Sequence, residues 1–161
     1  MKYEIERFNP CEDALEFRKK YKTFRVAWNN CPRGDWMLWL AEKLQVDRRL
    51  LVLTGGHCAN TVRHLMGDER STKGVDACIA YGEGRIGEDE LDAAMDAAMD
   101  AAWAADAAFN AADAAAYAAY AAADANAAAD AAYAAKKNQK ATADICRKYL
   151  TKSVMEKIKS L

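Results

Sequence analysis

The chain has 161 residues, a formal net charge of −1 and an apolar content just over half, much of it alanine. This length predicts a single domain, and the absence of about 18 consecutive uncharged apolar residues excludes a membrane-spanning helix. The amino terminus carries no apolar secretory segment and the five cysteines show no CxxC spacing, so we expect free, buried thiols in a cytoplasmic protein.

The first predicted helix starts at Asn9, because asparagine caps helices and the following Pro10 fits the first helical position. Thr23 is an alternative cap for a second, shorter helix. Aromatic residues recur at helical spacing through this region and predict a face turned toward a core: Phe17, Tyr21, Phe24 and Trp28.

A turn at residues 32–34 precedes the next predicted helix, which Asp35 is placed to cap. Trp36 and Trp39, together with Leu40 and Leu44, form its apolar face. Two interpretations remain open for the tryptophans. They pack into the core, or they anchor a recognition patch, since aromatic residues are enriched at interfaces.

Further short helices are predicted up to residue 87. One starts at Asp47 and is broken by Gly55–Gly56, and another is capped by Ser71 and ends at residues 82–84. No segment alternates between apolar and polar residues as a half-buried strand does, so no sheet is predicted.

Residues 88–136 predict one long alanine-rich helix, because no Gly or Pro follows Gly87 and alanine is the best helix former. Placed at 100° per residue, one half of this helix is bare alanine from Leu91 to Asp124. The other half carries the larger residues, which we call the stripe: Met95, Met99, Trp103, Asp106, Phe109, Asn110, Asp113, Tyr117, Tyr120 and Asp124. The bare half would allow another helix to approach closely.

The remaining residues, 137–161, predict short basic helices that pack back, one of them starting at Ser153 with Glu156 as its capping box. The predicted fold is therefore all-α: a bundle of short helices (1–87), the long alanine-rich helix (88–136) and the C-terminal short helices. Residues 88–135 hold ten acids and no Lys or Arg, whereas residues 136–161 hold eight bases and two acids. This segregation predicts that the basic tail, or a basic partner, lies along the acidic helix.

No catalytic or metal-binding pattern is evident. His57, Cys58 and His64 do not supply the four ligands of a zinc site, and adjacent helical residues such as His57 and Cys58 point about 100° apart. We therefore expect no enzymatic activity, no metal and no cofactor.

Four blocks of the sequence resemble alanine-rich proteins encoded by tailed phages, a family named as immunity proteins by analogy. The blocks are CPRGDWMLWLA (31–41), HCANTVRHLMGDERS (57–71), YGEGRIGEDEL (81–91) and ADICRKY (143–149). The resemblance implies an all-helical fold, a phage or prophage source and expression in the bacterial cytoplasm. It implies no catalytic residues.

The leading functional hypothesis is a non-enzymatic phage accessory protein that binds a protein of the host or of its defence system. Alternatives are a self-associating structural protein, such as a homodimer, or an acidic DNA-mimic inhibitor, since the aspartates are spaced about 6 Å apart along one helix flank. Direct contact with nucleic acid or a membrane is not expected. The candidate binding residues are Trp36, Trp39, Met99, Trp103, Asp106, Asp113, Tyr117 and Tyr120.

Overall fold

The computed structural model describes residues 5–99 and 125–161, with the side chains of residues 5–64, 66–99 and 136–161. Within these ranges every regular element is helical, which confirms the all-α class. In the same ranges, no helix combines the length and the apolar character needed to cross a membrane. The predicted long helix is described only at its two ends, residues 88–99 and the part from Ala125 onward, and its middle lies outside the described residues.

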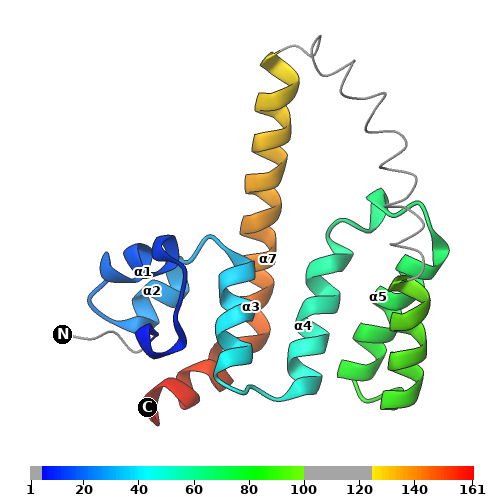
Figure 1. Ribbon diagram of the computed structural model, residues 1–161, viewed down its shortest axis with the longest axis horizontal. Helices are drawn as coiled ribbons and strands as arrows, with labels where there is room; N and C mark the ends of the chain where they lie inside the picture. The colour runs from blue at the N-terminus through cyan, green and yellow to red at the C-terminus, as the bar shows by residue number, and fades with distance from the viewer. Residues whose placement is uncertain (1–4, 100–124) are drawn as a thin grey trace.

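The helices are arranged around the carboxyl-terminal one. In chain order they are the 3-10 turn η1 (Glu6–Phe8), α1 (Glu12–Lys19), α2 (Phe24–Asn30), α3 (Gly34–Lys43), α4 (Arg48–Asn60), the turn η2 (Arg63–Leu65), α5 (Glu69–Gly82), the helical residues 88–99 and α7 (Ala125–Lys159). α7 packs against α3 and α4, with α1 and α2 on one side of the molecule and α5 on the other (Figure 1).

α7 is one continuous helix of 35 residues, so the prediction of separate C-terminal short helices starting anew at Ser153 is wrong. The reason lies in the buried face. Ala143, Cys146, Leu150 and Val154 follow one another at intervals of three or four residues and are all completely buried. An unbroken helix keeps them on one face, whereas a new start at Ser153 would rotate Val154 away from the core.

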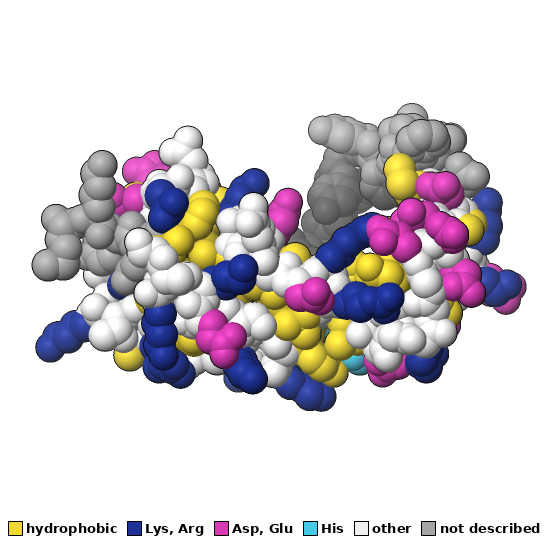
Figure 2. Space-filling model, turned by 90° about the horizontal axis from the view of Figure 1, so that it is seen from below, with side chains coloured by type: hydrophobic (Ala, Val, Ile, Leu, Met, Phe, Trp, Pro, Cys, Tyr) yellow, Lys and Arg dark blue, Asp and Glu magenta, His cyan; other side chains and the backbone are white. Residues whose placement is uncertain are grey.

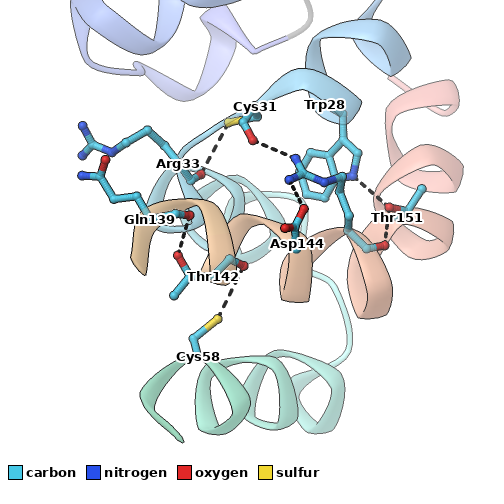
Figure 3. Close-up of polar contacts among 9 residues, drawn as sticks. Trp28, Cys31, Arg33, Cys58, Gln139, Thr142, Asp144 and Thr151 are labelled. Carbon is cyan, nitrogen blue, oxygen red and sulfur yellow. Dashed lines mark hydrogen bonds and ion pairs between the residues drawn. The ribbon is translucent and has the colours of Figure 1, made fainter. Parts of the chain in front are cut away.

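The core lies where α7 meets α2, α3 and α4, and Met37, Leu150 and Val154 are among its most deeply buried side chains. Polar contacts fix the helices around it. The buried Trp28 indole Nε1 donates a hydrogen bond to Thr151 Oγ1 at 2.9 Å (Figure 3). This hydrogen bond joins residues far apart in the sequence, so early and late segments of the chain build one core.

Two predicted helix starts are confirmed. Thr23 Oγ1 accepts a hydrogen bond from the backbone N–H of Val26 at 3.3 Å, at the start of α2. Asp47 Oδ1 accepts one from the N–H of Leu50 at 3.1 Å, at the start of α4. Both side chains satisfy an N–H group that the first helical turn leaves without a backbone partner.

Three other predicted starts are wrong, in each case because another nearby residue begins the helix. Asn9 adopts a left-handed conformation at the end of η1, with φ of 57°. Asp35 lies inside the first turn of α3 and pairs with Arg33, their Oδ2 and Nη2 atoms 2.5 Å apart. Asp68, three residues before Ser71, caps α5 by accepting a hydrogen bond from the N–H of residue 70.

The predicted break at Gly55–Gly56 is also wrong, because α4 runs through both residues. Gly56 allows the antiparallel α5 to come close: a Cβ atom there would lie 2.9 Å from Cys78 Cβ. Gly82 does the same from the α5 side, where an added Cβ would lie 2.3 Å from Leu53 Cβ. Close packing of the two helices offsets the backbone entropy that glycine loses inside a helix.

The predicted end of α5 at residues 82–84 is confirmed, and Gly84 has the positive φ of 76° expected at a helix terminus. Arg49 of α4 reaches this end. Its Nη1 donates a hydrogen bond to the Tyr81 carbonyl oxygen at 2.6 Å, and its guanidinium stacks 4.3 Å from the Tyr81 ring centroid. A cation at a helix C-terminus is favoured by the helix dipole.

Candidate functional site

A groove lies between α4, α5 and the helical residues 88–99, with a volume of about 380 Å³. We call it the small-residue groove, because glycine and alanine form much of its lining: Gly55, Gly56, Ala59, Gly74 and Ala98. Side chains this short leave the helix backbones near the surface of the groove. An apolar side chain or a helix face could therefore approach closely.

Sulfur-containing side chains lie at one edge of the groove. Met95 lines it, and its Sδ accepts a hydrogen bond from the Cys78 thiol at 3.6 Å. Met95 is 40% exposed and Met99, one turn further along, is 50% exposed. Methionine is flexible and polarisable, and such residues are common at surfaces that adapt to different partners. Met99 is a predicted binding residue; it lies one turn beyond Met95 on the same helix and is not itself part of the groove lining.

The segment that carries Met95, residues 88–99, also carries five acidic side chains. Figure 2 shows acidic side chains gathered beside hydrophobic ones at the end of the molecule that α5 and residues 88–99 form. Arg48 of α4 forms ion pairs with Glu88 and Asp92, while Asp89 and Asp96 are exposed. Among the described residues, the acids of this segment therefore form ion pairs with Arg48 of α4, and not with the basic C-terminal residues as the sequence predicts.

On the α4–α5 side, Arg63 and Asp76 form a bidentate ion pair, with Nη1–Oδ1 and Nη2–Oδ2 distances of 2.5 and 2.8 Å. The hydrogen bonds from Arg63 hold the pKa of the Asp76 carboxyl below its usual value. Both side chains are exposed to solvent, so this ion pair contributes little to the free energy of folding.

Trp36 and Trp39 do not belong to the small-residue groove. Both are partly buried on α3 and pack against the core. The Trp36 ring lies 6.0 Å from the Phe17 ring and 4.7 Å from the Arg33 guanidinium, measured between centres. The tryptophans also line a small cavity of about 50 Å³ between α1, α2 and α3. The structure therefore assigns them contacts on a different side of the molecule from Met99.

The other predicted binding residues lie outside the described residues: Trp103, Asp106, Asp113, Tyr117 and Tyr120. The groove was missed by sequence reasoning, because its glycines were interpreted as a helix break. A usable signal was nonetheless present. The signal is a cluster of small residues within one helix, Gly55, Gly56 and Ala59, followed by another small residue, Gly74, in the next helix.

The histidines singled out in the sequence lie on different elements. His57 belongs to α4, and its ring stacks on Tyr149 of α7 with a centroid distance of 4.9 Å and an interplanar angle of 7°. The Tyr149 hydroxyl is 3.0 Å from His57 Nε2. His64 lies in η2 and is exposed. The His57–Tyr149 contact joins two core helices, which gives this histidine a structural role.

Five free thiols differ widely in exposure. Cys11 is exposed and Cys78 is half-buried, so the expectation of buried thiols is wrong for Cys11. Cys31, Cys58 and Cys146 are buried around α7. Burial raises the pKa of the Cys31 thiol, which donates a hydrogen bond to the Arg33 carbonyl oxygen at 3.4 Å.

Small residues thus serve two different purposes in this chain: they bring α3, α5 and α7 close to their neighbours, and they line an apolar groove together with Met95. A search of protein-family models, of curated proteins and of solved structures finds no match to the chain.

Proposed function

We propose that the chain is a non-enzymatic accessory protein of a tailed phage that acts in the bacterial cytoplasm by binding a protein of the host or of its defence system. The small-residue groove is the observation that supports this most directly. It is apolar and open, and it is lined by Met95, which exposes 40% of its surface; Met99, 50% exposed, follows one turn later on the same helix. Exposed apolar surface next to charged residues is typical of protein interaction sites.

The groove fits a partner that presents an apolar helix face or a few apolar side chains. Gly55 is open to the groove, because a Cβ atom added there would meet no other atom within 4 Å. A helix face could therefore contact the α4 backbone at this point. The exposed Asp89 and Asp96 nearby favour a partner that carries basic residues beside its apolar ones.

Filling the groove is expected to abolish partner binding without loss of the fold. In Gly55→Phe the new side chain enters open space on a helix, where replacing glycine removes an unfavourable residue. Affinity capture from bacterial lysate with the tagged wild-type chain should recover a specific protein. The Gly55→Phe variant should recover at least about tenfold less, equivalent to about 1.4 kcal/mol of binding free energy.

Gly67→Phe is the matched control, because Gly67 is exposed, lies outside the groove and also has no atom within 4 Å of an added Cβ. It should capture the same protein as the wild type. Both variants should keep the far-UV circular dichroism of the wild type. Equal recovery by Gly55→Phe and the wild type, or no specific protein with either, would contradict the proposal.

Self-association is a second candidate, supported by the separation of charge. All charged residues of the segment 88–99 are acidic, and its two methionines are exposed. The end of α7 instead carries Lys157 and Lys159, close in sequence to Leu161, which is 50% exposed. Complementary ends of this kind favour head-to-tail contact between copies. The DNA-mimic alternative has less support, because Arg48 already pairs with two of the acids, Glu88 and Asp92.

Charge exchange tests the second candidate. If copies associate through these ends, Asp89→Lys/Asp96→Lys and Lys157→Glu/Lys159→Glu should each be monomeric alone and should form a 1:1 complex when mixed. Light scattering coupled to size-exclusion chromatography at low and high salt measures this, and salt should weaken the complex. A wild-type chain that is monomeric at 100 µM and low salt would exclude this candidate.

A further inference from the structure

Cys58 of α4 and Cys146 of α7 meet inside the protein. The Cys58 side chain points toward α7, where its thiol donates a hydrogen bond to the Thr142 carbonyl oxygen at 3.8 Å (Figure 3). Cys146 lies one turn after Thr142 on the same helix, so it lies on the same side of α7 as the carbonyl group that Cys58 contacts. The pair bridges two elements that are distant in sequence but in direct contact.

The surroundings hold the two sulfur atoms in place. Cys146 donates a hydrogen bond to the Gly34 carbonyl oxygen at 3.5 Å, so α3 covers it from the other side. Above and below the pair, the α4–α7 contact is fixed by Thr61 with Asn138 (2.7 Å between oxygens) and by His57 with Tyr149. Neighbouring contacts on both sides prevent the two thiols from moving apart without disturbing the core.

The two thiols differ in exposure and in acidity. Cys58 keeps 9% of its surface exposed, while Cys146 is completely buried. Interaction with the Cys146 side chain lowers the pKa of Cys58, because it favours the thiolate. The same interaction with Cys58, together with burial, raises the pKa of Cys146. Cys58 is also the only thiol of the pair with surface exposed to solvent, so it is the one that a small oxidant reaches first.

We propose that Cys58 and Cys146 form a modification site for hydrogen peroxide, which converts them to a disulfide joining α4 to α7. In the first step the Cys58 sulfur attacks one peroxide oxygen, the O–O bond breaks, and water leaves as Cys58 becomes a sulfenic acid. In the second step the Cys146 sulfur attacks the Cys58 sulfur, the S–O bond breaks, and the hydroxyl group leaves as water with the Cys146 proton. Two thiols lose two electrons, and one peroxide becomes two waters.

Peptide mapping of the full chain tests the pairing. The reduced protein is treated with hydrogen peroxide, its remaining thiols are alkylated under denaturing conditions, and it is digested with trypsin. Peptides 50–63 and 141–147 each contain one cysteine, Cys58 and Cys146. They should appear joined, with the loss of two hydrogens, and dithiothreitol should separate them. The exposed Cys11 is an internal control for the peroxide dose.

Variants and stability separate this pair from the other thiols. Cys58→Ser and Cys146→Ser should lose the cross-link, while Cys11→Ser should keep it. The oxidised wild type should melt about 10 °C higher than the reduced protein, because the disulfide closes a long loop of the unfolded chain. The proposal fails if Cys58 and Cys146 stay fully alkylated at a dose that oxidises half of Cys11. It also fails if peptide 141–147 joins instead to peptide 26–33, which holds Cys31.

Discussion

Gly34→Ala should lower the free energy of unfolding by about 3 kcal/mol, because the new methyl group would push α3 away from α7. A Cβ atom at residue 34 would lie 2.4 Å from Thr142 Oγ1 and 2.7 Å from the Thr142 carbonyl carbon. The latter is backbone and cannot rotate aside. Separation of the helices would also weaken the hydrogen bond from Cys146 to the Gly34 carbonyl oxygen. Urea unfolding followed by far-UV circular dichroism measures the loss.

Gly55→Ala is the control for the first result. It makes the same change inside a helix, but in open space. It should therefore stabilise the protein by about 0.5–1 kcal/mol, since alanine loses less backbone entropy than glycine. A Gly34→Ala variant as stable as the wild type would show that α3 and α7 do not approach as closely as described.

Leu150→Ala should cost about 2–5 kcal/mol, because it leaves a cavity at the centre of the core. The Leu150 side chain is completely buried on α7. Leu161→Ala is the matched control, because it removes the same atoms from a leucine that is 50% exposed. It should change the free energy of unfolding by no more than about 0.5 kcal/mol. Equal unfolding midpoints for the two variants would contradict the assignment of Leu150 to the core.

The helical class and several local features could be predicted from the sequence, because they depend on residues close together in the chain. Thr23 and Asp47 cap their helices as expected, since each oxygen needs only the N–H group three residues ahead. Asp68 and Ser71 show the limit of this reasoning. Both could begin α5, and a capping side chain alone does not decide between two such neighbours.

Glycines and the start signal at Ser153 could not be interpreted without the tertiary contacts. Gly55 and Gly56 look like a break, but α5 packs across Gly56 and keeps α4 helical. Ser153 has the residues of a capping box, but the buried faces of Leu150 and Val154 require α7 to continue. In each case contacts from a distant segment outweigh a local preference of about 1 kcal/mol.

The candidate site was predictable only in part. Of the stripe of large residues that the sequence indicates, Met95 lines the groove, and Met99 lies one turn further along the same helix. The groove itself needs α4, α5 and residues 88–99 to come together, and no local pattern encodes that meeting. The prediction of Trp36 and Trp39 as binding residues depends on residue type alone. Their partial burial against Phe17 and the core is decided by how α1 folds over α3.

The contribution of α7 to the core has a consequence for synthesis. On the ribosome α2, α3 and α4 emerge long before α7, yet Trp28 and Cys31 bond to Thr151 and Arg147, more than one hundred positions later. Until α7 has been synthesised, the apolar faces of the early helices lack this partner, and chaperones and proteases can reach them. The nascent chain therefore passes through a vulnerable interval whose length is set by the translation time of the alanine-rich segment.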